Sequence, residues 1–135
     1  MTTTPTLTEA QRAFLSQPRF AVLATINADG SPQLTTMWYE LQGDEIMMNT
    51  KAGRLKDRNM RRDPRVALCF EDGYSYVTIS GSVRLIEDQP TAQADIRRLA
   101  LRYHGAGKAD QMVRDQFAHE RRITLRLAIE HVIEH

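Results

Sequence analysis

The sequence predicts one mainly β domain of the α+β class, in which six antiparallel strands form a barrel-type sheet with a few short helices at its periphery. Strand-like runs rich in β-branched and aromatic residues follow one another through short turn sequences. The sequence lacks the regular alternation of strands and helices that is typical of a parallel sheet. The chain has 135 residues, which is typical of a single compact domain, so we treat 1–135 as one unit.

The first third of the chain reads as a helix followed by three strands. Thr8 and Gln11 have the spacing of a capping box, which predicts a helix continuing to about Ser16. Hairpin-type turn sequences then separate the strands of an antiparallel meander. The predicted strands span 20–26, 33–41 and 45–50, with turns at 27–30 and 42–44.

The middle of the chain predicts a short helix between a loop and two further strands. The helix covers 54–62. It must end before Asp63, because Pro64 disfavours helical geometry in the residue that precedes it. Strands follow at 66–70 and 74–85. Gly81 lies inside the longer strand, where a glycine typically marks a bulge or bend.

The last third predicts two helices and a final strand. A helix starts at 88–91 and carries an apolar stripe that should pack on the sheet. The glycine-containing segment 104–108 is expected to break it, a second helix is expected over about 109–117, and residues 123–129 alternate as a strand. The stripe consists of Ala92, Ile96, Leu99, Ala100 and Tyr103.

Composition limits the classes of function. The formal net charge is +1, which provides no broad field for nucleic acid, and the single Cys69 excludes an intramolecular disulfide. The N-terminus lacks the pattern of a signal peptide, and no apolar run is long enough to span a bilayer. We therefore expect a cytoplasmic protein with no nucleic-acid or membrane partner, and residues 1–6 to be flexible.

The segment 50–65 is dense in lysine and arginine and is the strongest chemical signal. It joins the end of a strand to the start of a helix, where free backbone amides favour an anion. Gly53 permits close approach of the backbone, while Arg54 and Lys56 supply donors, so a phosphate fits here. The alternatives are a solvated helix paired with nearby aspartates and, less favoured, a nucleic-acid site.

Other catalytic signatures are missing from the sequence. The four histidines lack the spacing of metal ligands, so no metal site is predicted. There is no Gly-x-Ser-x-Gly motif, and the segment 105–108 lacks the spacing of a phosphate loop. Aromatic and sulfur-containing residues on the adjacent hairpin are either core or the lining of a slot for a planar ring. These residues are Met37, Trp38, Tyr39, Met47 and Met48.

Several segments resemble the pyridoxamine 5'-phosphate oxidase-like, FMN-binding split β-barrel superfamily. The strongest is the run 54–66, supported by 20–25 with 29–33, by 72–76, and by Gly81. The similarity runs from about Leu7 to Val132 and is greatest to the branch that uses coenzyme F420, a deazaflavin. The resemblance implies a split β-barrel and a homodimer with cofactor sites at the subunit interface.

By position in the family, residues from the basic helix and from two strands would hold the cofactor. The phosphate would lie near Arg54, Lys56 and Asn59, and the ring or its side chain near Thr50, Thr35, Thr36 and Met37. Lys51 or Arg58 would meet a polyglutamate tail. The partner's region around Tyr74 would complete the wall, and Tyr74 is a weak candidate for the proton donor.

The sequence departs from the family pattern at two places. Asp57 stands where relatives often have serine or threonine, and we expect it to face solvent and pair with Arg61. The chain ends soon after Val132, without the extension of a true pyridoxamine phosphate oxidase, so vitamin B6 oxidation is not expected.

The expected function is hydride transfer between coenzyme F420 and a small conjugated organic substrate. The alternatives are an FMN-dependent oxidoreductase of the same fold and a non-catalytic protein that binds a flavin, a deazaflavin or haem.

Overall fold

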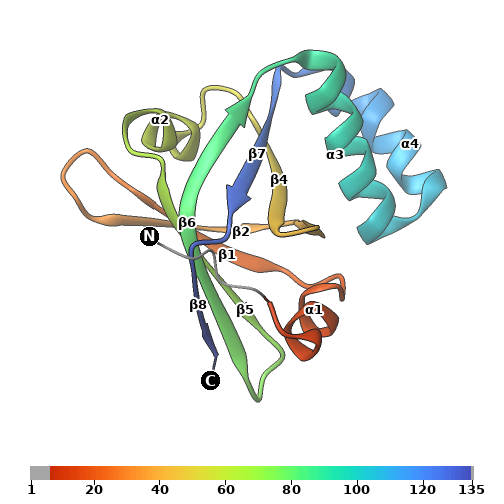
Figure 1. Cartoon of the computed structure of the whole chain (residues 1–135). Coiled ribbons are helices and arrows are strands. Elements are labelled where there is room, and N and C mark those ends of the chain that lie inside the picture. Colours follow the sequence, from red (N-terminus) through yellow and green to blue (C-terminus); the bar gives the residue numbers. More distant parts are fainter. Residues whose placement is uncertain (1–6, 135) are drawn as a thin grey trace.

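A curled antiparallel sheet forms the body of the molecule, and helices lie around it (Figure 1). The computed structural model describes residues 7–134. Within them the strand order is β2-β1-β5-β6-β7-β4-β3, with β8 paired to β6. The strands are β1 Ala21–Ile26, β2 Pro32–Met37, β3 Glu40–Gln42, β4 Glu45–Lys51, β5 Arg65–Glu71, β6 Tyr76–Ile86, β7 Arg122–Ala128 and β8 His131–Glu134.

The predicted fold class is confirmed, and the strand count rises from six to eight across residues 7–134 for two local reasons. The strand expected over 33–41 is interrupted at Trp38 and Tyr39, where the Tyr39 N–H donates to the Tyr103 hydroxyl at 3.1 Å. The end of the chain adds β8. The expectation of flexibility for residues 1–6 lies outside the described residues.

Gly81 lies in β6, which pairs with β5 along one edge and with β8 and β7 along the other. Position 81 is where the partner along that second edge changes from β8 to β7. It pairs with Val66 in regular register, so the predicted bulge is not in β6 itself. The pairing on the other edge of β6 shifts by one residue between Val83↔Leu127 and Ser80↔His131. The extra residue therefore lies in the facing segment, whose Ala128 carbonyl oxygen lies too close to position 81 to leave room for a Cβ. Glycine is required here for close approach of two backbones.

Four α-helices and one 3-10 turn are present among the described residues. The predicted break at 104–108 is narrower than expected, because Gly105 alone, with a φ of +81°, separates two helices. The second of them therefore begins at Ala106 rather than near Ala109. The elements are α1 Glu9–Leu15, α2 Leu55–Arg62, α3 Gln89–His104, α4 Ala106–Asp115 and the 3-10 turn Phe117–His119.

Two apolar cores stabilise this arrangement. The larger one fills the inside of the curled sheet, and Tyr39 and Phe70 are among its largest fully buried side chains. The smaller one lies among α3, α4 and the 3-10 turn, and it includes Ile96, Ala100 and Phe117. The helical pair of α3 and α4 is thereby held beside the sheet, where α3 packs on β4 and β7 and, with the 3-10 turn, supplies one wall of a pocket.

None of the helices in residues 7–134 has the length and apolarity needed to cross a membrane.

Candidate functional site

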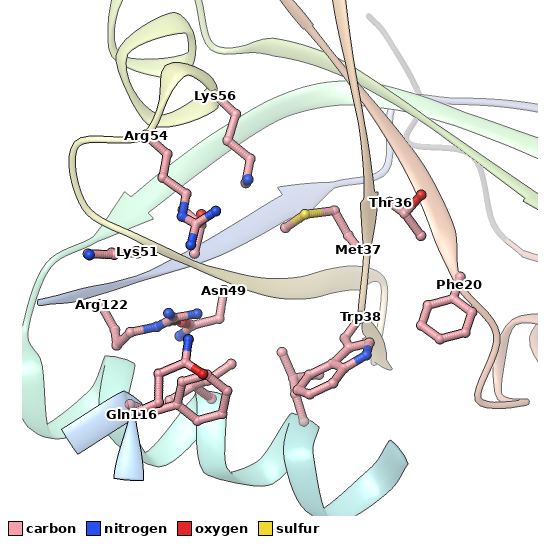
Figure 2. A pocket seen from close by; sticks show the side chains of 14 residues that line it. Phe20, Thr36, Met37, Trp38, Asn49, Lys51, Arg54, Lys56, Gln116 and Arg122 are labelled. Carbon is pink, nitrogen blue, oxygen red and sulfur yellow. Dashed lines mark hydrogen bonds between the residues drawn. The ribbon is translucent and has the colours of Figure 1, made fainter. Parts of the chain in front are cut away.

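A pocket of about 250 Å³ lies between the sheet, the start of α2 and the helical pair (Figure 2). Strands β2 and β4 contribute one side, and α3 with the 3-10 turn contributes the other. One part of its lining is basic and another is aromatic and aliphatic. The basic part consists of Lys51, Arg54, Lys56 and Arg122, and the apolar part of Phe20, Met37, Trp38, Ile96, Leu99 and Phe117.

The turn that leads into α2 brings two of these cations to the pocket. Gly53 adopts a φ of +90°, and its N–H donates to Asp57 Oδ2 at 2.8 Å, which closes the turn onto the helix. Among the described residues, no side chain caps the start of the helix at Arg54. Unpaired amides in a first helical turn carry partial positive charge, so they add to the field of the two cations.

Asp57 differs from expectation in one respect. It pairs with Arg61, whose Nε lies 2.8 Å from Asp57 Oδ1, as the spacing along the helix predicted. It does not face solvent, however, because the residue is buried and accepts the Gly53 N–H. The carboxylate is therefore engaged in holding the turn.

Lys56 is the most informative residue in the pocket. Only 8% of it is exposed, and its ammonium group points into the pocket (Figure 2). Burial lowers the pKa of Lys56, and the positive charges of Arg54 and Arg122 lower it further. Within residues 7–134, neither the Lys56 ammonium nor the Arg54 guanidinium has a hydrogen-bond or ion-pair partner. The Lys56 ammonium keeps some access to solvent through the pocket, but a mostly buried lysine without a counterion favours the arrival of an anion there.

Arg122 lies in the same pocket, and our sequence analysis missed it. The residue is 6% exposed, and its Nε donates to Asn49 Oδ1 at 2.9 Å while Nη1 donates to Glu120 Oε1 at 2.8 Å. Its guanidinium carbon lies 4.9 Å from the centre of the Phe117 ring. Burial lowers the pKa of Arg122 and Glu120 opposes that shift.

The signal that would have identified Arg122 is its strand pairing. It lies directly opposite Lys51 in the β4–β7 register, and like charges facing each other across strands are unfavourable. Glu120 lies close to both, since its Oε2 is 3.8 Å from Lys51 Nζ. This juxtaposition could be recognised only once β4 was known to pair with β7.

Stacked aromatic rings support the apolar part of the pocket. The ring centres of Trp38 and Tyr103 are 5.3 Å apart, and the two rings are 13° from parallel. The ring centre of Phe20 lies 5.8 Å from that of Tyr103. Trp38 and Phe20 both line the pocket. Together with Met37 and Leu99 they offer a surface suited to a planar ring.

The structure brings six of the eight predicted cofactor residues to this pocket, namely Thr36, Met37, Thr50, Lys51, Arg54 and Lys56. Thr35 does not line it. Asn59 is fully buried away from it, where its amide donates to Thr25 Oγ1 at 3.1 Å and to Asn27 Oδ1 at 2.8 Å. Asn59 thus ties α2 to the end of β1. Tyr74, in the turn between β5 and β6, is fully exposed and outside the pocket.

Groups of three or more histidine, cysteine or acidic residues that could hold a metal ion are absent from the part of the chain that the structure describes.

Comparison with known proteins links this chain to a family. A family model described as pyridoxamine 5'-phosphate oxidase matches residues 7–135. The fold is similar to a conserved hypothetical protein from Mycobacterium tuberculosis, with 32% identity, a TM-score of 0.80, and coverage of 98% of this chain and 89% of that one.

Two further solved structures share the fold. An F420 reductase has 24% identity and a TM-score of 0.76, with 94% of this chain and 98% of that chain covered. A protein of unknown function from Agrobacterium tumefaciens also has 24% identity, with a TM-score of 0.72 and coverage of 92% of this chain and 54% of that one.

Proposed function

The chain belongs to the pyridoxamine 5'-phosphate oxidase family, and on that premise we propose that it is an oxidoreductase that binds a phosphate-bearing flavin or deazaflavin in this pocket. Coenzyme F420 is the preferred cofactor, and a small conjugated organic molecule is the substrate. The observation that carries the proposal is that Lys56, a mostly buried residue, turns its ammonium into the pocket beside an aromatic wall, without a hydrogen-bond or ion-pair partner in residues 7–134.

The residues of the pocket fit such a cofactor by their chemistry. Arg54 and Lys56 would hold the phosphate, supported by the free amides at the start of α2. Thr36, Met37 and Thr50 lie along the strands that would flank the ring. When bound, a flavin or deazaflavin supplies the hydride chemistry, so the protein needs only to bind, orient and exclude water.

Two observations favour F420 over FMN. The fold matches an F420 reductase over nearly the whole of both chains. Lys51 lines the pocket with its side chain about half exposed, and it would meet the carboxylates of a polyglutamate tail. FMN remains the second candidate because the matching family model is that of pyridoxamine 5'-phosphate oxidase. A non-catalytic carrier of the same cofactors differs from both in showing no turnover.

We further propose that the protein acts as a homodimer in which the partner completes the pocket. At about 250 Å³ the pocket is smaller than the roughly 300–1,000 Å³ typical of ligand sites. Thr36 lines it and also lies on the exposed outer face of β1 and β2 beside Val22. A partner docked on that face would add a second wall, to which the exposed Tyr74 at the tip of the β5–β6 hairpin would contribute.

Binding of F420 and FMN, measured by fluorescence titration, tests the cofactor site. Lys56→Ala should weaken binding by about 1.5–3 kcal/mol, or roughly 10- to 100-fold, which is typical of a lost hydrogen bond to a charged group. Lys108→Ala is the matched control, because it makes the same change at an exposed lysine on α4 that does not line the pocket. Equal effects of the two variants, or none from Lys56→Ala, would contradict the proposed site.

Turnover tests the enzymatic part of the proposal separately. Reduced F420 bound by the protein should be oxidised by at least one member of a panel of enones, quinones and nitro compounds. Tight binding without oxidation by any of them would leave a carrier rather than an enzyme.

A further inference from the structure

The pocket holds more positive charge than one singly charged group requires. Lys51, Arg54, Lys56 and Arg122 all line it, and Glu120 is the carboxylate that contacts two of them. Arg54 and Arg122 each oppose the charged form of Lys56, and Arg54 likewise opposes that of Arg122. The cations are therefore close enough to repel one another in the free protein.

We propose that Arg122 is a third arm of the anion site, and that the pocket consequently binds a group carrying at least two negative charges. A phosphomonoester, a pyrophosphate, or a phosphodiester with a neighbouring carboxylate has this chemistry. The inference rests on the proposed function, whose pocket it specifies further by the charge of the ligand. It adds to the site a residue that lies sixty positions beyond the end of the basic helix.

The surroundings of Arg122 hold its guanidinium in one orientation. Asn49 accepts from Nε and Glu120 from Nη1, while Phe117 lies against the guanidinium. Asn49 is itself anchored, since its amide donates to the Ala92 carbonyl at 2.9 Å and to Thr124 Oγ1 at 3.3 Å. Nη2 makes no hydrogen bond or ion pair within residues 7–134, which leaves that nitrogen available to a ligand in the pocket.

This geometry differs from that of a purely structural arginine. The Arg102 guanidinium, by comparison, donates to the carbonyls of Tyr39, Ser16 and Gln17 through both Nε and Nη2. Arg122 likewise has two nitrogens bonded to its neighbours, but it lines the cavity shared with Arg54 and Lys56, and its third nitrogen is not buried. A preorganised guanidinium binds an anion at little further entropic cost.

Two small probes that differ by one charge test the proposal. Methyl phosphate carries close to two negative charges near neutral pH and dimethyl phosphate carries one. Calorimetric titration of the full chain should show methyl phosphate binding about 10-fold more tightly than dimethyl phosphate. Arg122→Gln, which removes the charge but keeps a polar side chain, should reduce that preference towards equality.

Arg121→Gln is the matched control. Arg121 precedes Arg122, is exposed, and lies near Glu87 at 3.7 Å outside the pocket, so its loss should leave the preference unchanged. An unchanged preference in Arg122→Gln, or an equal loss of affinity for both probes, would show that Arg122 is only part of the wall and overturn the proposal.

A second variant keeps the test decisive if Arg122→Gln does not fold. Glu120→Gln retains an oxygen that can accept from Arg122 Nη1 but removes the negative charge beside it. Methyl phosphate should then bind several-fold more tightly, because the net charge of the pocket rises. Weaker binding would contradict the inference.

Measurements of cofactor binding separate the inference from the proposed function. If the wild-type protein prefers methyl phosphate and binds neither F420 nor FMN, the proposed function fails and the doubly charged anion site stands. If FMN binds no better than riboflavin, the phosphate contributes nothing, and the inference fails while flavin binding stands.

Discussion

Tyr39 shows how one buried polar group connects distant parts of the chain. Its hydroxyl lies 2.9 Å from the Leu15 carbonyl oxygen and 3.1 Å from that of Gln17, and donates to them, while its ring packs edge-on against Phe70 at 4.6 Å. Burial raises the pKa of Tyr39 to about 12, with a smaller contribution from Tyr103. The phenol therefore stays neutral and bonded at ordinary pH, which fixes the segment that leads into β1.

Tyr39→Phe should lower the free energy of unfolding by about 1–2 kcal/mol, because buried carbonyl oxygens lose their donor. In the wild-type protein the folded pKa is about 12 and the ordinary value is 10.0. The contribution of Tyr39 is thus complete below pH 10 and is lost as the pH rises towards 12, since the unfolded chain then releases its proton first.

Urea unfolding across this alkaline range measures both effects. The difference between wild type and Tyr39→Phe should shrink above pH 10, the ordinary tyrosine value. Tyr74→Phe is the control, because Tyr74 is fully exposed and its loss should change stability little. A difference that does not vary with pH would contradict the buried hydrogen bond.

At the scale of elements, α2 divides its residues between structure and site. Met60 and Asn59 face inward, and Asn59 joins the helix to β1 through Thr25. Arg54 and Lys56, at the other end, face the pocket. Because one short helix does both, the position of the cations depends on the packing of the helix against β1.

β6 is the element on which the closure of the sheet depends, and Gly81 is its critical position. Gly81→Ala would place a Cβ against the Ala128 carbonyl oxygen, and two paired backbones cannot move apart cheaply. We expect the free energy of unfolding, measured with urea, to fall by about 1–3 kcal/mol, as at other overpacked sites.

Gly107→Ala provides the opposite case. Gly107 lies in α4, and a Cβ there would meet nothing within 4 Å. Alanine is the better helix former by about 0.5–1 kcal/mol, so this variant should be slightly more stable than wild type. Equal behaviour of the two glycine variants would contradict the close backbone approach at position 81.

At the scale of the whole molecule, one face of the sheet is left open. Direct strand pairing places Leu34 beside Ala24, Val22 beside Cys69, and Ile133 beside Thr78 on the same side. Leu34 is 63% exposed, and Val22 and Ile133 are also exposed. The opposite side carries Leu23, Leu68 and Ile79, all of them in the core. An exposed apolar face of this kind is typical of an interface.

Leu34→Glu should therefore convert a dimer to a monomer in sedimentation velocity experiments, since a charge at an apolar interface is costly. It should also weaken F420 binding, because the second wall of the pocket is lost. Leu101→Glu is the control, with the same change on an exposed part of α3. A wild-type protein that sediments as a monomer with F420 bound would rule out the dimeric site.

Local sequence alone determined much of this protein. The capping box of Thr8 and Gln11, the helix that ends before Pro64, the turn glycines and the core-facing alternation of β7 are all present as predicted. The same holds for the basic start of α2 at Arg54 and Lys56. These features depend on capping, steric limits and side-chain periodicity within a few residues, which any folded context preserves.

The pairing of distant strands was decided only by the tertiary structure, and with it the composition of the pocket. Arg122 and Asn49 meet because β7 pairs with β4, and Trp38 faces the pocket because Tyr103 on α3 stacks behind it. Asn59 is buried for the same kind of reason, through contacts with β1. Register between strands follows from which apolar faces pack together over the whole chain, so it could not be deduced from any one segment.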